Sequence, residues 1–253
     1  DPWAGVEYAW SNGGSLKYVG GYVNANVRVL NTKNWKWELG ASMGTFKNVV
    51  TQLPDQTIIN KNWTEKDGEL RGFTTEAYGA TIVTAVGQPA GLFFGYETDG
   101  VIASTAEAYD EAKGDWVLKT YDVNTGVKTP LEAGDVKFVD QNGDGLISID
   151  DRVIIGNPNP DFYGNINSNL TFKNFSLSAT LNYSLGNDVY NYQRALLESG
   201  SSFYNQTIAV TNRWKVEGQQ TDMPRASYGD PKGNNRFSDR WIEDGSYLKL
   251  KNV

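Results

Sequence analysis

Lys17-Tyr-Val-Gly-Gly-Tyr-Val-Asn-Ala-Asn-Val-Arg-Val29 alternates apolar and polar residues with a period of two. The odd positions are mostly small apolar residues: Val19, Val23, Ala25, Val27 and Val29. Successive side chains of a β-strand point to opposite faces, so this stretch predicts a strand with one apolar and one polar face. The same alternation recurs at 35–45 and 175–185, and 166–172 continues it on the preceding stretch.

These stretches are long. Strands of soluble sheets average about 5–6 residues, whereas a strand tilted across a bilayer needs about 9–11. We therefore expect membrane-crossing strands, with odd positions of 17–29, 35–45 and 175–185 facing lipid and even positions of 17–29 facing a water-filled interior. The expected strands cover about 16–30, 35–47, 162–172, 175–186 and 247–253.

The connections between these strands are unequal. Asn31-Thr-Lys-Asn34 and Lys173-Asn174 form tight polar turns, while the other strand ends lead into long segments at about 48–160 and 187–246. Short turns on one side and long loops on the other are typical of outer-membrane barrels. The sequence predicts an all-β, antiparallel transmembrane β-barrel segment with long extracellular loops. Closure of the barrel needs further strands, and the missing initial Met and the strand-like end at Val253 lead us to expect a piece of a longer protein.

Composition excludes several classes of function. The 253 residues contain no Cys and no His, so disulfides, Cys/His zinc sites and catalytic triads that need His are excluded. The net charge is −7 without a basic block, which argues against a nucleic-acid partner. No apolar run approaches the length of about 18 residues that a membrane helix needs.

An acidic loop follows the pattern of an EF-hand calcium loop. Asp140-Gln-Asn-Gly-Asp-Gly-Leu-Ile-Ser-Ile-Asp-Asp151 has oxygen side chains at loop positions 1, 3, 5 and 12, Gly at 6 and Ile at 8. The loop predicts a structural calcium site, although Asp at position 12 reaches less far than the usual Glu. An Asx- and Gly-rich turn without metal is the alternative. The predicted ligands are Asp140, Asn142, Asp144, the backbone carbonyl of Leu146, and Asp151.

Local patterns add further expectations for the long segments. Thr105–Ala112 predicts a short helix capped by Thr105, and Trp116–Tyr121 predicts a strand. Aromatic residues near strand ends, such as Trp35 and Trp37, fit a girdle at the bilayer interface. Aromatic residues of the long segments are candidates for contacts with a substrate or partner: Tyr96, Tyr109, Trp116, Tyr204 and Tyr228. Five arginines could clamp an anionic substrate, but ordinary salt bridges are the simpler expectation: Arg194, Arg213, Arg225, Arg236 and Arg240.

Several short sequence motifs occur in the same order as in one known protein family. They include Gly134-Asp-Val-Lys-Phe-Val-Asp140, Asp151-Arg-Val-Ile-Ile-Gly-Asn-Pro158, Gly186-Asn-Asp-Val-Tyr-Asn191 and Ser238-Asp-Arg-Trp-Ile-Glu-Asp-Gly-Ser-Tyr-Leu248. Over roughly 86–253, this series resembles the SusC/RagA family of TonB-linked outer-membrane transporters of Bacteroidota. Residues 1–50 resemble it only loosely, as generic barrel strands.

The resemblance implies a segment from the C-terminal half of a barrel of about 22 strands. It implies import of oligosaccharides or peptides across the outer membrane, energised through TonB, with a SusD-like surface lipoprotein as partner. The plug domain and the TonB-contacting segment of the family are not expected within these residues. The resemblance implies no enzymatic activity.

Two other classes stay open on the residues alone. A secreted calcium-dependent β-sandwich that binds carbohydrate would account for the acidic loop and the aromatic residues, but not for the strand lengths. An enzyme would need a catalytic constellation. Neither Glu107 with Asp110 and Glu111, nor Glu243 with Asp244, forms a recognisable one in sequence.

Overall fold

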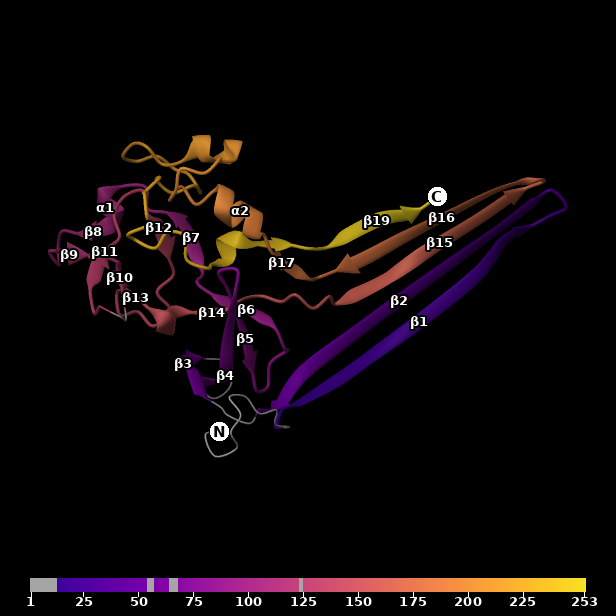
Figure 1. Cartoon of the computed structure of the whole chain (residues 1–253), viewed down its shortest axis with the longest axis horizontal. Helices are drawn as coiled ribbons and strands as arrows, with labels where there is room; N and C mark the ends of the chain where they lie inside the picture. Colours follow the sequence, from indigo (N-terminus) through magenta and orange to yellow (C-terminus); the bar gives the residue numbers. More distant parts are fainter. Residues whose placement is uncertain (1–12, 54–56, 64–67, 123–124) are drawn as a thin grey trace, which may run out of the picture.

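The chain builds a long five-stranded antiparallel sheet that projects from a second folded part made of shorter strands and helices (Figure 1). The computed structural model describes residues 13–53, 57–63, 68–122 and 125–253. We call this sheet the long sheet, and the parts formed by 53–161 and 186–246 the body. The strands of the long sheet, in spatial order, are β1 (Ser15–Asn31), β2 (Trp35–Gln52), β15 (Phe162–Phe172), β16 (Phe175–Leu185) and β19 (Tyr247–Asn252).

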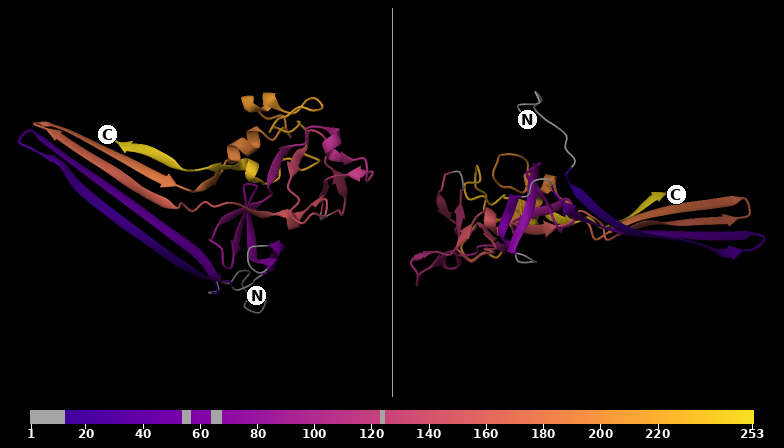
Figure 2. Two further views of the ribbon diagram at one scale, coloured as in Figure 1. Left: turned by 180° about the vertical axis from the view of Figure 1, so that it is seen from behind. Right: turned by 90° about the horizontal axis from the view of Figure 1, so that it is seen from below.

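The antiparallel all-β class predicted from the alternation is confirmed. The main difference from the expected bounds is in β2, which continues to Gln52 because its last residues join the body. Val50 N donates to Gln88 O at 2.9 Å, and the Asn48 amide bonds to both Asn159 and Ala90 N. Figure 2 shows the long sheet as a single layer beside the body.

Both tight turns lie at the end of the long sheet away from the body, which we call the tip (Figure 1). Thr32 closes the first turn, since its N–H donates to Trp35 O at 2.7 Å and its hydroxyl accepts from Trp35 N at 3.0 Å. Lys173 N donates to Asn34 O at 2.9 Å, so the two turns are tied together. The long connections therefore all leave from the opposite end, as the unequal segment lengths predict.

Lys173 adopts a left-handed backbone conformation with φ +52°. A side chain in this region costs roughly 1 kcal/mol that glycine does not incur. We expect Lys173→Gly to preserve the turn and to slow unfolding of the full-length receptor modestly, whereas the β-branched Lys173→Val should accelerate it. Unfolding rates in urea, followed by electrophoretic mobility, check this; equal rates for both variants would contradict it.

The body contains short strands and turns instead of open loops. Its largest sheet has the order β14 (Val153–Gly156), β6 (Leu92–Gly95), β5 (Ala80–Ala85), β4 (Gly68–Ala77) and β3 (Thr57–Trp63). Three two-stranded sheets pair β7 (Thr98–Val101) with β12 (Val136–Phe138), β8 (Tyr109–Asp110) with β9 (Asp115–Trp116), and β17 (Asp188–Tyr190) with β18 (Ile242–Asp244). A three-stranded sheet has β10 (Lys119–Tyr121) between β11 (Lys128–Pro130) and β13 (Leu146–Ile147).

The helices of the body are short. They are α1 (Thr105–Ala108), α2 (Tyr192–Leu197) and 3-10 turns at Ile149–Asp151, Ile208–Asn212 and Asp239–Trp241. Across the described ranges, none of the helices has the length and apolar character needed to cross a membrane.

Two local predictions for the body were wrong. The helix expected at Thr105–Ala112 ends at Ala108, and Ser104 is its N-cap, without a side-chain cap bond. The strand expected at Trp116–Tyr121 is divided between β9 and β10. In both cases the cause is the pairing of Tyr109 with Trp116, which folds 109–116 into a hairpin.

The buried core of the body lies beside the acidic loop. Its largest cluster contains Tyr96, Ile102, Ala108, Leu131, Val136, Phe138 and Ile147. Ile147, the apolar residue at position 8 of the acidic loop, is fully buried there. The acidic loop is thus anchored through one aliphatic side chain to the packing of the body.

Candidate functional site

The long sheet has one apolar and one polar face. One face is formed by the odd-numbered residues of β1 and β2, which pair with each other. Even-numbered residues of β15 and odd-numbered residues of β16 continue this face across the sheet. This face, the apolar face, carries residues such as Val23, Ala25, Val27, Leu39, Ala41, Met43, Ile166, Leu170, Phe175, Leu177, Leu181, Leu248 and Leu250. Phe175 is 78% exposed and Leu248 67%, so large side chains on it are uncovered.

Aromatic residues mark the tip of the apolar face. The Trp35 and Phe172 ring centroids are 4.2 Å apart, and Trp37 Nε1 donates to Ser168 Oγ at 3.1 Å. Trp and Tyr settle at membrane–water interfaces because their rings are apolar and their N–H or O–H groups are polar. The position of Trp35 and Trp37 on the apolar face beside the turns fits the predicted girdle. Trp3 and Trp10, the first aromatic residues of the sequence, lie outside the described residues.

The polar face is formed by cross-strand rows. Successive rows on one face lie about 7 Å apart, because each strand advances two residues between them. Four successive rows, given from the body toward the tip, are Tyr22–Gly44–Tyr163–Ser184–Tyr247, Asn24–Ser42–Asn165–Asn182–Lys249, Asn26–Gly40–Asn167–Thr180 and Arg28–Glu38–Asn169–Ser178. Asparagine dominates the second and third rows.

The third and fourth rows enclose a hollow of about 440 Å³ on the polar face. Its lining residues include Gly40, Asn26, Asn167 and Asn169. Arg28 Nε donates to Glu38 Oε1 at 3.0 Å across it, which leaves the hollow without net charge from this pair. We call this feature the amide hollow.

An aromatic cluster lies at the body end of the polar face. The rings of Tyr18 and Phe46 stack with centroids 4.9 Å apart, and Phe46 meets Tyr163 edge-on at 6.0 Å. Tyr163 lies against Gly44, where a Cβ atom would come within 2.7 Å of the tyrosine ring. Because these rings are on the polar face, they are not part of an interfacial girdle. The contacts between these rings could not be predicted from the sequence, because they depend on the register of the strands.

The acidic loop is organised by hydrogen bonds to its own backbone. Asp140 accepts from Gly143 N and Gly145 N, each at 2.7 Å, and Asp144 accepts from Leu146 N at 2.7 Å. Asn142 Oδ1 accepts from Asp144 N at 2.9 Å. Gly145 has φ +76°, the sharp bend expected at position 6. These are the bonds of an Asx-rich turn, the alternative to a metal loop.

Asp151 closes the acidic loop from a buried position. Its carboxylate accepts from Gln141 N at 3.0 Å and Ser148 N at 2.7 Å. Burial raises the pKa of Asp151, and the charges of Asp140 and Asp144 raise it further, against the opposing effect of the two backbone hydrogen bonds. Within the described ranges, no three acidic side chains converge as a metal-ligand set.

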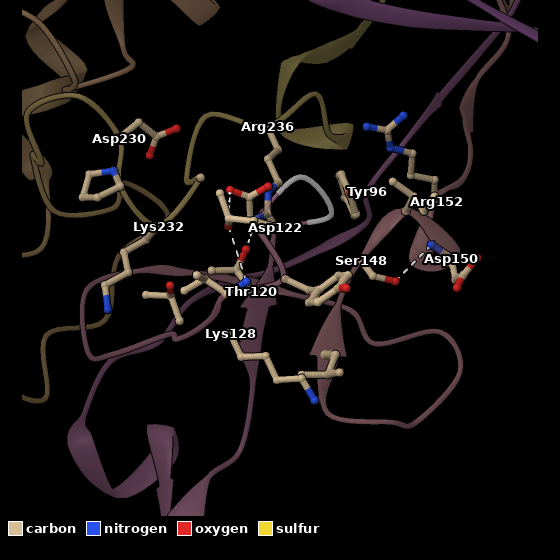
Figure 3. Close-up of a pocket in the computed structure, with 18 of the residues that line it drawn as sticks. Tyr96, Thr120, Asp122, Lys128, Ser148, Asp150, Arg152, Asp230, Lys232 and Arg236 are labelled. Atoms are coloured by element: carbon tan, nitrogen blue, oxygen red, sulfur yellow. Dashed lines mark hydrogen bonds between the residues drawn. The ribbon is translucent and has the colours of Figure 1, made fainter.

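A cavity of about 930 Å³ adjoins the acidic loop (Figure 3). Asp144, Asp150, Lys232 and Arg236 are among its lining residues. The Arg236 guanidinium lies 5.5 Å from the Tyr96 ring centroid and 5.6 Å from that of Phe138, and it bonds to the Thr120 hydroxyl. Burial lowers the pKa of Arg236. Acidic and basic groups are mixed around this cavity, so it does not select one sign of charge.

The other singled-out arginines mainly hold the body together. Arg225 donates to Asp135 through Nε and Nη2, each at 3.0 Å, and Arg194 bonds to Glu198 and Glu243. Burial opposes the charge of Arg225, yet Asp135 and Glu132 raise its pKa overall. Arg240 lies 4.6 Å from the Trp241 ring centroid, and burial lowers its pKa to about 10.

The aromatic candidate residues of the long segments differ in burial and packing. Tyr96 is largely buried in the core and also lines the cavity beside the acidic loop. Tyr109 and Trp116 pack edge to face on each other across their hairpin. Tyr204 and Tyr228 are exposed.

Curated relatives match nearly the whole chain. A TonB-dependent receptor, P3, of Formosa agariphila is 30% identical over 258 residues, covering 99% of this chain and 22% of the receptor. TonB-dependent receptor P26 of the same organism is 28% identical over 242 residues, and TonB-dependent receptor SusC of Bacteroides thetaiotaomicron is 25% identical over 245 residues. The chain spans about a fifth of the length of these relatives. No family model matches it.

Solved structures agree on the fold. The RagAB peptide importer in its closed-closed state superposes with a TM-score of 0.67 at 19% identity, covering 99% of this chain and 24% of that chain. A second structure of the RagAB peptide transporter gives 0.64. The resemblance inferred from the sequence is confirmed: over nearly its whole length the chain is similar to a segment of SusC-like TonB-dependent receptors.

Proposed function

We propose that the long sheet is part of the wall of an outer-membrane transporter barrel. The two-faced sheet is the observation that carries this proposal. Its apolar face is uncovered over strands of 11 to 18 residues in β1, β2, β15 and β16, which is long enough to cross a bilayer. In water such a face would be an aggregation site, whereas lipid solvates it. The polar face would then line the interior.

The edges of the long sheet support its continuation by further strands. Among the described residues, β1 pairs only with β2, and β19 only with β16. Unpaired N–H and C=O groups are costly in hydrocarbon, so a membrane-embedded sheet must close on itself. The remaining strands would come from the rest of the receptor.

We propose that the body lies at the cell surface. Tight turns of outer-membrane barrels face the periplasm, and long segments face outward. We propose that the full receptor imports an oligosaccharide or a peptide with energy transmitted by TonB, and that a SusD-like lipoprotein docks on the outer side. The names of the relatives, TonB-dependent receptors and the RagAB peptide importer, support this role.

Heat modifiability of the native receptor tests the barrel proposal. An antibody to this segment should detect, in outer-membrane fractions, a polypeptide far larger than 253 residues whose mobility in detergent gels changes on boiling. A small soluble species indifferent to boiling would contradict the proposal. That result would favour the calcium-dependent binding module, although among the described residues no second sheet covers the apolar face (Figure 2).

We further propose that the acidic loop takes up a structural calcium ion. The support is the donor set of Asp140, Asn142, Asp144, the Leu146 carbonyl and Asp151, with the bend at Gly145. Burial raises the pKa of Asp151, and the charges of Asp140 and Asp144 raise it further; a divalent cation would offset both effects by pairing with the charged carboxylates. Calcium would lock the loop against the core through Ile147.

Chelation provides the test of this calcium site. Calcium should slow protease cleavage within 130–160 of the full receptor, and a chelator should remove that protection. Asp140→Ala with Asp144→Ala should abolish the calcium response, whereas Glu111→Ala, at an exposed acidic position, should retain it. If a chelator does not change the protease protection of the unmutated receptor, the calcium proposal is wrong.

A further inference from the structure

We infer that the body is braced on the long sheet and moves with it as one rigid unit. The brace is a chain of hydrogen bonds across the end of the long sheet next to the body. We call this chain the polar collar, and its members are Asn48, Ala90, Asn157, Asn159 and Asp188. This inference goes beyond the barrel proposal and does not depend on it, because the bonds of the polar collar join described residues to one another.

The body replaces a missing neighbour strand at the end of β2. The pairing of β2 with β1 runs to the end of the strand, but its pairing with β15 ends at Gly44. Beyond that point the turn at 86–91 lies against β2: Val50 N donates to Gln88 O at 2.9 Å, and Gly87 N donates to Val50 O at 2.8 Å. The body thus pairs backbone groups of β2 that β15 does not reach.

Two asparagine side chains hold Ala90 of that turn. Asn48 Oδ1 accepts from Ala90 N at 2.8 Å, and Asn159 Nδ2 donates to Ala90 O at 3.2 Å. Asn48 Nδ2 donates to Asn159 Oδ1 at 3.1 Å, which closes the group, and Asn48 is buried. Because a buried amide is costly to leave unpaired, these bonds fix the turn on β2.

The polar collar continues from Asn159 to the β16 side of the sheet. Asn159 N and Nδ2 both donate to Asn157 Oδ1, at 3.0 and 2.8 Å. Asn157 N donates to Asp188 Oδ2 and Asp188 N donates to Asn157 O, each at 2.7 Å. Asp188 begins β17, where the ladder between β16 and β19 resumes as the ladder between β17 and β18. The body is therefore attached at two separate places along the end of the sheet.

Proline restricts the two segments that meet at Ala90. They are Gln88-Pro-Ala90 and Asn157-Pro-Asn-Pro160. Proline fixes φ at about −65° and keeps the preceding residue extended. A hinge needs a few residues that absorb a large change of φ and ψ, and these segments have few torsions free to do so.

The glycines in the connections from sheet to body are also held. Gly186 N, between β16 and β17, donates to Ser246 Oγ at 2.9 Å. Gly245 N, between β18 and β19, donates to Asn187 O at 2.7 Å. A rotation of the body about either connection would break these bonds together with the polar collar.

A distance measurement on the purified full-length receptor tests the brace. One nitroxide would be attached at Ser178 on β16 and one at Glu111 in the body, in a receptor otherwise free of cysteine, and pulsed EPR would give their separation. We expect a single narrow distribution, which Asn48→Ala with Asn159→Ala should broaden. Asn182→Ala, which removes an asparagine amide from within β16 outside the polar collar, should leave it narrow.

Hydrogen exchange tests the continuity of the polar collar without labels. Asn48→Ala should raise exchange about tenfold at 86–91 and 157–161, because it removes bonds that hold both segments. Since the chain of bonds continues to Asp188, exchange at 186–190 should rise as well. A rise confined to 86–91 would overturn the continuous collar.

Two results of the distance measurement would overturn the brace. A broad or two-peaked distribution in the receptor with an intact polar collar would mean that the body swings on the sheet. An unchanged distribution in the Asn48/Asn159 variant would mean that the polar collar is not what holds the body. A receptor that fails the heat-modifiability test would instead refute the barrel proposal, while a narrow distribution would still support the brace.

Discussion

Leu181→Arg in the full-length receptor should prevent assembly into the outer membrane or strongly reduce it. Leu181 pairs with Ile166, and Ile166 with Ala41, so it lies in the middle of the apolar face. An arginine facing lipid at the bilayer midplane costs about 2–4 kcal/mol, which is a large share of the stability of a typical protein. The amount of heat-modifiable receptor in the outer membrane measures the effect.

Thr180→Arg is the matched control for Leu181→Arg. Thr180 is the adjacent residue on β16 but points to the polar face, opposite Asn167. The same charge should be tolerated there, with receptor levels near those of the unmutated protein. Equal loss in both variants would mean that the two faces do not differ in environment, and the proposed orientation of the sheet would be wrong.

Asp135→Ala should locally destabilise the body by about 3 kcal/mol, because it breaks an ion pair whose carboxylate is completely buried. Asp135 is completely buried, and its carboxylate accepts bonds from Arg225, Asn234 Nδ2 and Glu132 N. Its removal leaves the Arg225 guanidinium without its main partner. Hydrogen exchange in the full receptor should show protection of 134–138 and 225–237 falling by roughly a hundredfold or more.

Asp99→Ala is the control for this second prediction. Asp99 also forms an ion pair, with Lys137, but both side chains are substantially exposed. Exposed pairs contribute about 0–1 kcal/mol, so exchange in the same peptides should hardly change. If Asp135→Ala were as mild as Asp99→Ala, the buried network would not be what holds 225–237 on the body.

The long sheet could be predicted because its signal is local. Alternation in Val23–Asn24–Ala25–Asn26 specifies the two faces without knowledge of the partner strand. The turn at Lys173 is equally local. What the pattern could not supply is register, which brings Asn26, Gly40 and Asn167 into one row from three strands distant in sequence.

The body was harder to predict because its contacts are long-range. From the sequence, Tyr96 was expected to be an aromatic residue of a long connecting segment. In the structure it packs against Phe138 and Arg236, which are remote in the chain. Trp116–Tyr121 read as one strand, but Lys119 pairs with Leu146 of the acidic loop while Trp116 turns back to Tyr109. The spacing of the acidic loop was visible in sequence, whereas the hydrogen bonds that organise its carboxylates depend on the folded backbone.

Single-cysteine labelling along β16 tests the central claim most directly, since this segment contains no cysteine of its own. Cysteines placed one at a time at positions 176–184 of the full receptor would be treated in intact outer membranes with a water-soluble maleimide. The two-faced sheet predicts labelling at even positions and protection at odd positions, with a strict period of two. Uniform labelling, or labelling at the odd positions, would contradict a membrane wall with its apolar face in lipid.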